Sequence, residues 1–311
     1  MKILDAAQTA AALPFARLIP ALRDAFVAGA EAPLRHRHDI AQSDGTDAAL
    51  LLMPAWRAGG FLGVKVVSVF PGNGTRGLPA VSASYLLCDG ATGQHVALID
   101  GAELTRRRTA AASALAGSFL ARDDAASLLI VGSGHIGGLM ASAYREVRPI
   151  ERVRVWNVRE AGASRLVARL RAEGWAAEVV DDLGAAVSRA DIVTCATLAR
   201  EPLVRGEWLH PGTHLDLIGG FTPAMREADD EAVRRSRVFI DTDAALSESG
   251  DLLDPIAHGV LRREAIAGSL SSLCRGETQG RRDRAEITLF KSVGSALEDL
   301  AAAVLALGSP I

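Results

Sequence analysis

The chain has few cysteines and no grouping of residues that suits a metal ion. Its 311 residues include three cysteines, Cys88, Cys195 and Cys274, which lie far apart in the sequence. No Cys-x-x-Cys pair occurs, so the sequence indicates neither a disulfide framework nor a zinc site. The seven histidines are also dispersed, and only His36 and His38 stand close together. A metal site needs three or four such ligands, so we expect none here.

Long hydrophobic runs and an excess of one charge are also missing. The chain has 34 Lys and Arg residues against 37 Asp and Glu, scattered along its length, for a net charge of −3. This excludes the basic stripe that is typical of nucleic-acid-binding proteins. No segment approaches the roughly 20 apolar residues of a membrane span, and the first residues lack the apolar run of a secretory signal peptide. We therefore expect a cytoplasmic protein that binds neither nucleic acid nor membranes.

The middle of the chain alternates short apolar runs with amphipathic segments. A chain of this length predicts two domains. Strand and helix alternating at this spacing predict a parallel sheet covered by helices on both faces, and six strands are the number in a complete doubly wound dinucleotide-binding domain. The predicted strands are residues 128–131, 153–156, 177–180, 192–195, 214–218 and 238–240.

The two ends of the chain have a different pattern. Three strands are predicted early in the sequence, and a short connection containing glycine joins the last two into an antiparallel hairpin. An alanine-rich helix follows, and the last stretch again has a helical period. These segments are residues 61–70, 82–88 and 95–99 for the strands, and 103–121 and 287–307 for the helices. We predict an α/β fold in which a Rossmann domain, residues 119–288, is inserted into an α+β domain, residues 1–118 and 289–311.

A glycine-rich loop directly follows the first strand of the predicted Rossmann domain. Gly132 permits a tight turn, Gly134 lets a pyrophosphate approach the backbone, and Gly137 lets the next helix pack against the strand. The phosphates of the cofactor would lie on amide donors at the start of that helix. The predicted cofactor-binding loop is Gly132, Ser133, Gly134, His135, Ile136 and Gly137.

The end of the second strand bears on the choice between NADP and NAD. An acidic residue about 20 positions beyond the loop would bind the ribose 2′-hydroxyl of NAD. Asn157 stands there instead, and Arg159 is placed to meet the 2′-phosphate of NADP. NADP is therefore favoured. NAD remains the alternative, because Glu160 can neutralise Arg159.

Two further loops follow strands of the same sheet. Ligands of doubly wound sheets bind beyond the carboxyl ends of the strands. Cys195, Ala196 and Thr197 end one predicted strand, and Gly219 with Gly220 follows the next. We expect both loops to border the cofactor, although the glycine pair is also compatible with a simple turn.

Lys65 interrupts a predicted strand that is apolar on both faces. Its own face carries Gly63, Val67 and Val69. A lysine in that position either reaches solvent at a sheet edge or serves a buried anion. A desolvated lysine is also prone to a lowered pKa, which suits acid–base chemistry. The strand pattern alone leaves both interpretations open.

Taken with its neighbours, Lys65 is part of a series of motifs that resembles the ornithine cyclodeaminase/mu-crystallin family over nearly the whole chain. The resemblance implies a homodimer whose N-terminal domain holds the subunit interface and the substrate pocket. It also implies hydride transfer between a nicotinamide cofactor and the α-carbon of an amino or imino acid. The motifs are residues 53–55 (Met-Pro-Ala), 65–67 (Lys-Val-Val), 70–73 (Phe-Pro-Gly-Asn), 77–79 (Gly-Leu-Pro), 108–113 (Arg-Thr-Ala-Ala-Ala-Ser), 132–137, 248–251 (Glu-Ser-Gly-Asp) and 290–294 (Phe-Lys-Ser-Val-Gly).

The resemblance assigns roles to residues of these motifs. Lys65 and Arg108 are the implied catalytic and substrate-carboxylate-binding pair. Arg35 matches a further arginine that binds the carboxylate, and Met53 belongs to the substrate pocket. The guanidinium of Arg108 suits a carboxylate, and the ammonium of Lys65 can donate a proton to an imine nitrogen. Val293 and Gly294 are implied to contact the cofactor.

One departure from the family pattern concerns the substrate. Ornithine cyclodeaminases that resemble this chain carry an Asp after the glycine pair, whereas this sequence has Phe221. Ala80 likewise replaces a Thr. Both changes favour a reductase of cyclic imino acids, acting on Δ1-pyrroline-2-carboxylate or Δ1-piperideine-2-carboxylate. Ornithine cyclodeaminase, an alanine-type dehydrogenase and a non-catalytic NADP-binding protein remain alternatives, the first because Glu227 or Asp229 could supply the missing acid.

Overall fold

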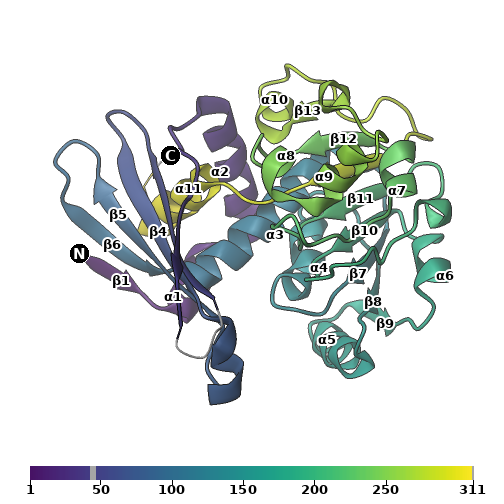
Figure 1. Ribbon diagram of the computed structural model, residues 1–311, viewed down its shortest axis with the longest axis horizontal. Helices are drawn as coiled ribbons and strands as arrows, with labels where there is room; N and C mark the ends of the chain where they lie inside the picture. The colour runs from purple at the N-terminus through teal and green to yellow at the C-terminus, as the bar shows by residue number, and fades with distance from the viewer. Residues whose placement is uncertain (43–46, 310–311) are drawn as a thin grey trace. The chain divides into compact units, whose positions relative to one another are not determined.

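The computed structural model describes residues 1–42 and 47–309, which form two compact units (Figure 1). Unit 1 contains the residues up to Arg108 and those from Ser295 onward, and unit 2 contains Thr109–Gly294. These divisions differ from the predicted domain boundaries by about ten residues at the first and six at the second. The first falls inside one continuous helix, α3 (Gly101–Leu120), which starts in unit 1.

Unit 1 is built on a six-stranded sheet with the order β1-β6-β5-β4-β3-β2. The three predicted strands are present, and β5 and β6 form the predicted antiparallel pair. The other three strands were not predicted, because β1 is very short and the apolar run of β3 has no alternation that separates strand from helix. The bounds are β1 (Lys2–Leu4), β2 (His36–Ile40), β3 (Ala48–Trp56), β4 (Phe61–Val69), β5 (Val81–Asp89) and β6 (His95–Asp100).

Helices of unit 1 cover one face of this sheet. The C-terminal helix α11 (Ala296–Leu307) packs on β3, β4 and β5 and against α2 (Phe15–Ala28). Residues that pair across neighbouring strands point to the same face, so Met53, Lys65 and Tyr85 form a row across β3, β4 and β5. All three are buried. The remaining helices are α1 (Ala6–Ala12) and the short 3-10 helix η1 (Pro71–Arg76).

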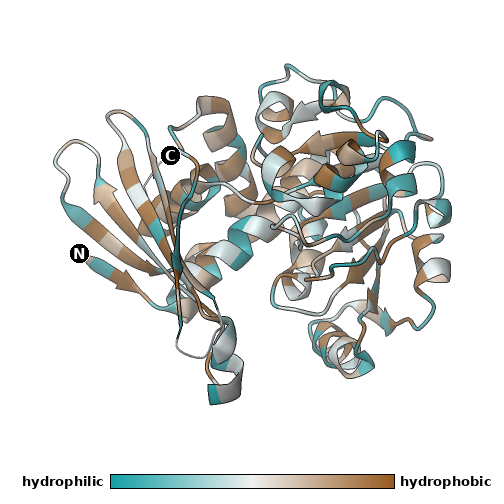
Figure 2. Ribbon diagram, viewed as in Figure 1, coloured by the Kyte–Doolittle hydropathy of each residue, from teal (hydrophilic) through white to brown (hydrophobic). Residues whose placement is uncertain are grey.

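The opposite face of the sheet carries apolar side chains on β3 and β4 that are partly exposed. Side chains alternate between the two faces of a strand, so Leu62, Val64 and Val66 point away from Lys65. Leu62 and Val66 are each 37% exposed. Leu50 and Leu52 of β3 pair with β4 on this same face and are half-buried. Figure 2 shows that hydrophobic residues predominate along the strands of this sheet.

Unit 2 is a Rossmann domain with an eight-stranded parallel sheet in the order β13-β12-β14-β11-β10-β7-β8-β9. All six predicted strands are present. The order from β9 to β11 is the 3-2-1-4-5 order of a doubly wound sheet. The bounds are β7 (Ser127–Val131), β8 (Arg152–Trp156), β9 (Ala176–Val179), β10 (Ile192–Cys195), β11 (His214–Leu217), β12 (Arg237–Ile240), β13 (Gly268–Ser269) and β14 (Thr288–Lys291).

Strand β14 corrects the sequence prediction. A helical period was predicted over residues 287–307, but Thr288–Lys291 is a strand between β11 and β12. It lies next to β11, in the sixth position of the doubly wound order. Strand β12, which was predicted as the sixth strand, lies one position further out. All four of its residues are buried, and a short apolar run buried on both faces has the same pattern in a strand and in a buried helix.

The helices of unit 2 connect these strands, and the core lies between the helices and the sheet. Leu129, Val193, Leu215 and Leu289 on four adjacent strands are completely buried. No described helix in either unit is both long and apolar enough to cross a membrane. The helices are α4 (Gly137–Arg145), α5 (Glu160–Ala172), α6 (Leu183–Val187), α7 (Asp230–Arg235), α8 (Ala245–Glu248), α9 (Gly250–Ala257) and α10 (Leu270–Cys274), with the 3-10 helices η2 (Gly206–Trp208) and η3 (Arg263–Ala265).

Candidate active site

The glycine-rich loop of unit 2 has the geometry of a dinucleotide-binding turn. Gly132 has φ 103°, which L side chains rarely adopt, and it lies against the carbonyl oxygen of Ala196. A Cβ on Gly137 would collide with the carbonyl oxygen of Gly132. At Gly134, by contrast, an added Cβ would meet no atom within 4 Å. The loop is therefore tight at both ends and open in the middle, where a pyrophosphate would approach.

Asn157 connects this loop to the end of β8. Its Oδ1 accepts a hydrogen bond from the Ser133 amide at 3.2 Å, and its Nδ2 donates to the Arg159 carbonyl at 2.8 Å. Arg159 precedes α5, and its side chain is exposed. Glu160, the first residue of α5, is exposed as well.

Glu227 fixes the loops that follow β10 and β11. Its Oε1 accepts from the amide and hydroxyl of Thr197, each at 2.8 Å. Its Oε2 accepts from the amides of Gly219 at 2.8 Å and Gly220 at 3.2 Å. Glu227 is completely buried. Ala196, Thr197 and Gly219 therefore have a fixed backbone at the carboxyl ends of their strands, whereas the side chain of Cys195 is buried within β10.

Asp241 fixes the loop after β14 in a similar way. Its Oδ2 accepts from the Ser292 hydroxyl at 2.9 Å, the Val293 amide at 2.8 Å and the Gly294 amide at 2.6 Å. The structure thus brings the predicted cofactor residues of four loops to the carboxyl ends of β7, β10, β11 and β14. These strands are neighbours in the sheet. This is where ligands of doubly wound sheets bind.

A buried ion network lies beneath these loops. Lys291 Nζ, at the end of β14, is 2.8 Å from Asp251 Oδ2 and 4.0 Å from Glu227 Oε2, and all three residues are completely buried. Burial acts to lower the pKa of Lys291, but the two carboxylates outweigh it and the pKa is raised. Burial raises the pKa of Glu227 to about 7, against the opposing charge of Lys291. Asp251 and Lys291 come from two of the motifs noted in the sequence.

Unit 1 holds a second buried cluster, which we call the Lys65 cluster: Lys65, Arg108, Glu298 and Asp299. Lys65 Nζ forms an ion pair with Asp299 Oδ2 at 2.7 Å. Arg108 Nε donates to Asp299 Oδ1 at 2.9 Å, and its Nη1 donates to Glu298 Oε2 at 2.7 Å. Lys65 is 3% exposed, Arg108 is 4% exposed, and the two carboxylates are completely buried. The structure thus joins Lys65 to Arg108 through one carboxylate.

Burial and neighbouring charges set the protonation of this cluster. Burial lowers the pKa of Lys65 to about 8, with the charge of Asp299 opposing the shift and those of Arg108 and Arg35 adding to it. Burial acts to raise the pKa of Asp299, but Lys65 and Arg108 outweigh it and hold that pKa below its usual range. Near neutral pH Lys65 and Arg108 are therefore cations and Asp299 is a carboxylate, and of the two cations Lys65 releases a proton more readily.

Comparison with known proteins identifies the family. A sequence model of the ornithine cyclodeaminase/mu-crystallin family matches residues 2–307. The chain belongs to this family. It is 41% identical over 278 residues to a Delta(1)-pyrroline-2-carboxylate reductase of Paracoccus denitrificans, which covers 86% of this chain and 87% of the relative.

Solved structures of the family have the same fold over the whole chain. The Thermococcus litoralis Delta(1)-pyrroline-2-carboxylate reductase in complex with NADH and L-proline has a TM-score of 0.91 at 35% identity, covering 99% of this chain and 97% of that one. An archaeal alanine dehydrogenase dimer with bound NAD has a TM-score of 0.90 at 28% identity, covering 99% and 95%. Both relatives hold a nicotinamide dinucleotide, as the loop geometry of unit 2 leads one to expect.

The other residues singled out by the family resemblance lie in different surroundings. Met53 is buried and pairs with Lys65 across β3 and β4. Arg35 is half-buried and close enough for its charge to lower the pKa of Lys65. Phe221 follows Gly220 beyond the carboxyl end of β11 in unit 2 and is 44% exposed.

Three residues of unit 1 were missed by sequence reasoning. Glu298 and Asp299 are adjacent acids in a helix that is otherwise apolar, and that contrast was the available signal. Tyr85 pairs with Lys65 across β4 and β5, is completely buried, and has a hydroxyl without a hydrogen-bond partner in the described structure. Its ring occupies the space beside Gly63, where an added Cβ would collide with it.

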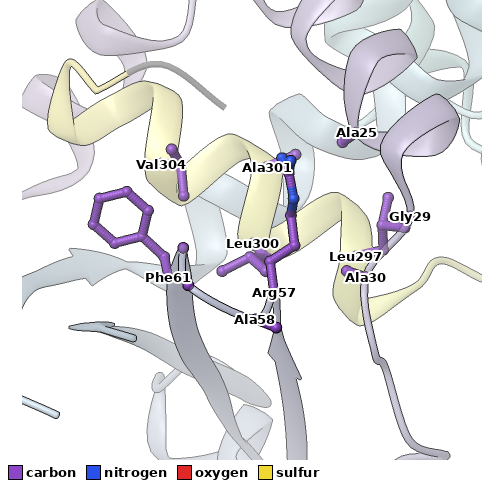
Figure 3. A pocket seen from close by; sticks show the side chains of 12 residues that line it. Ala25, Gly29, Ala30, Arg57, Ala58, Phe61, Leu297, Leu300, Ala301 and Val304 are labelled. Atoms are coloured by element: carbon purple, nitrogen blue, oxygen red, sulfur yellow. The ribbon is translucent and has the colours of Figure 1, made fainter. Parts of the chain in front are cut away.

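Unit 1 also has a cavity of about 310 Å³ along α11 (Figure 3). Neither Glu298 nor Asp299 is among the residues that line it. It is lined by Leu297, Leu300 and Val304 of α11, by residues at the end of α2, and by the turn between β3 and β4. Arg57 is its one charged lining residue and lies beside Ala301 in Figure 3. The lining offers no acid–base group, so the Lys65 cluster remains the candidate for catalysis.

Proposed function

We propose that this chain is a nicotinamide-dependent reductase of cyclic imino acids. It would convert Δ1-pyrroline-2-carboxylate to L-proline and Δ1-piperideine-2-carboxylate to L-pipecolate. The observation that carries this proposal is the buried ammonium of Lys65, held beside Arg108, in a chain that aligns over most of its length with Delta(1)-pyrroline-2-carboxylate reductases. A buried cation of this kind can both bind an anionic substrate and donate a proton.

The proposed chemistry is a two-electron reduction of a carbon–nitrogen double bond. When bound in unit 2, the reduced cofactor supplies a hydride to the imine carbon. Lys65 Nζ gives one proton to the imine nitrogen, so that one C–H bond and one N–H bond form and the C=N bond becomes single. Lys65 is left neutral and regains its proton from water. A pKa of about 8 suits a group that must give up and regain a proton near neutral pH.

Arg108 and Arg35 are proposed to bind the substrate carboxylate. A guanidinium has five N–H donors. Arg108 directs Nε and Nη1 to Asp299 and Glu298, so donors on Nη1 and Nη2 remain for a substrate. Holding the carboxylate in place also positions the adjacent imine carbon, which lowers the entropic cost of reaching a reactive geometry. Met53 would pack against the ring of the substrate.

The first experiment separates this function from ornithine cyclodeamination. Cyclising ornithine requires a group that accepts the proton of its second ammonium. Phe221 cannot do so, Glu227 already accepts four hydrogen bonds, and Asp229 caps α7 and accepts from Gly206 and Ala232 amides. We expect rapid cofactor oxidation with Δ1-pyrroline-2-carboxylate and little or no ammonia from ornithine. Phe221→Asp should raise ammonia release slightly.

Spectrophotometric assay of imine reduction, together with an ammonia assay on ornithine, provides the measurement. Phe221→Asn is the matched control, since it has the size of aspartate but cannot accept a proton. Robust formation of ammonia and proline from ornithine by the unmodified protein would contradict the proposal, as would failure to reduce either cyclic imine.

We also propose that NADPH is preferred to NADH. Asn157 stands where an acidic residue would bind the 2′-hydroxyl of NAD, and the exposed Arg159 is available for a 2′-phosphate. The relatives crystallised with NADH and NAD make NADH the alternative that the test must include.

A homodimer formed through unit 1 is the last part of the proposal. Its support is the face of the six-stranded sheet opposite Lys65, where Leu62 and Val66 are partly exposed beside Leu50 and Leu52. An apolar surface spread over several strands is typical of an interface between protein chains.

A further inference from the structure

Helix α11 carries two acidic residues among apolar ones. From Ala296 to Leu307, the only charged residues are Glu298 and Asp299, and both are completely buried. A buried carboxylate is strongly destabilising unless a cation and hydrogen bonds compensate it. Here Lys65 and Arg108 supply that compensation, so the two acids and the two cations have to be considered together.

The two carboxylates have different partners. Glu298 forms its ion pair with Arg108 at 2.7 Å. Asp299 divides its two oxygens, with Oδ2 at 2.7 Å from Lys65 Nζ and Oδ1 at 2.9 Å from Arg108 Nε. Asp299 is thus the residue through which α11 of unit 1 holds the ammonium on β4 and the guanidinium on α3 at a fixed separation.

We propose that Asp299 is a positioning residue of the reductase, which holds Lys65 charged and oriented, beside Arg108, for proton donation to the imine nitrogen. This role rests on the proposed function, since it concerns the proton that Lys65 donates. Asp299 itself needs no contact with substrate. Its two oxygens limit the rotation of both cations, which reduces the conformational freedom lost when a substrate binds.

The charges around Lys65 show why such a residue is needed. Arg108 on α3 and Arg35, in the segment before β2, both disfavour a charged Lys65, and burial adds to their effect. Tyr85 on β5 is buried, and its own raised pKa keeps its hydroxyl neutral. Glu298 faces Arg108, which leaves Asp299 as the carboxylate in contact with the ammonium. Loss of Asp299 would remove the contact that opposes these effects, so the pKa of Lys65 should fall.

The test is the pH dependence of kcat/KM for imine reduction in Asp299→Asn. This change keeps the size of the side chain and removes its charge. An opposite charge in contact with an ionisable group shifts its pKa by about 1–3 units. The basic limb of the pH profile should therefore move to lower pH by about 1–3 units. At pH 9, above the pKa of Lys65 in both proteins, the variant should be at least about tenfold slower, because there a shift of one pKa unit changes the protonated fraction about tenfold.

Two matched variants separate charge from packing. Glu298→Gln removes the charge that is paired with Arg108 and should move the basic limb less than Asp299→Asn does, because the ion pair of Lys65 is with Asp299. Asp299→Glu keeps the charge, so its limb should also stay in place while kcat falls about tenfold or more from displacement of Nζ. A purely structural role predicts a lower free energy of unfolding for Asp299→Asn, with the basic limb of its pH profile unmoved.

An unmoved basic limb in folded Asp299→Asn would overturn the proposal. If Asp299→Asn does not fold, Asp299→Glu becomes the test. A kcat of Asp299→Glu within twofold of that of the unmodified enzyme would then overturn the proposal. Failure of the proposed function is a separate outcome, since it would show as absence of imine reduction by the unmodified protein.

Discussion

At the scale of single residues, the same buried environment gives lysine two different uses in this chain. Lys65 has one carboxylate in contact and two arginines near it, and its pKa falls to about 8. Lys291 has two carboxylates near it and its pKa is raised, so it stays charged. Burial is complete or nearly so for both. The count of neighbouring charges therefore separates a lysine that can exchange a proton from one that is a structural cation.

The choice of cofactor is also decided by single residues. Initial rates of imine reduction should show a higher kcat/KM with NADPH than with NADH. Arg159→Ala should reduce the NADPH value about tenfold or more and leave the NADH value nearly unchanged, since a charged hydrogen bond to a phosphate is worth about 1.5–3 kcal/mol.

Arg165→Ala on the following helix serves as a control, because Arg165 is exposed but lies beyond the first turn of α5. A preference for NADH in the unmodified protein would contradict the proposal and would give Asn157 the role of a ribose ligand.

At the scale of elements, most of the fold could be predicted from the sequence, because the strands and loops with a strong local sequence pattern have the predicted structure in the folded chain. The six central strands and the glycine-rich loop of unit 2 are where the sequence placed them. Lys65 was singled out because a charge on a strand that is apolar on both faces needs a partner. Its partner Asp299 was not, since it lies on a distant helix that only the folded chain brings to β4.

Strand β14 shows the limit of local pattern. Its four residues are buried on both faces and have no alternation, and its neighbours β11 and β12 are remote in sequence. Lys291 at its end joins β14 to Asp251 at the start of α9. Its position is defined by parallel pairing with both neighbours, which a local pattern does not reveal.

Breaking this network should destabilise unit 2. Lys291→Met leaves Glu227 and Asp251 buried without a cation, and the free energy of unfolding should fall by about 3–5 kcal/mol near pH 8. Burial already raises the pKa of Glu227 to about 7, and without Lys291 this carboxyl would favour protonation in the folded state still more. A raised folded pKa contributes stability at low pH that is lost as pH rises through it, so the deficit should be smaller near pH 6.

Urea unfolding at the two pH values measures this deficit. Lys2→Met is the matched control, since Lys2 is exposed and the same substitution should change the free energy of unfolding by no more than about 0.5 kcal/mol. A loss for Lys291→Met that does not depend on pH would show that packing, and not the charge, is what the network provides.

At the scale of the whole molecule, the two faces of the sheet in unit 1 have different surroundings. The face with Met53, Lys65 and Tyr85 is covered by α11, whose acids complete the Lys65 cluster. On the other face, β3 and β4 carry apolar side chains that are not fully buried. A six-stranded sheet that buries only one face normally carries polar residues on the other. The composition of β3 and β4 therefore points to a second covering layer, which we propose is the same sheet of another chain.

Solution mass tests this assembly. The unmodified protein should run at twice its chain mass of 32.6 kDa in light scattering coupled to size-exclusion chromatography. Val66→Glu places a charge on the outer face of β4 and should yield monomers, because a like-charged pair facing itself across a two-fold axis costs several kcal/mol. Val27→Glu, the same change at a 48% exposed position on α2, should leave the dimer intact. Dimers of Val66→Glu alongside monomers of Val27→Glu would place the interface on the helical side of unit 1 and would rule out pairing through the sheet.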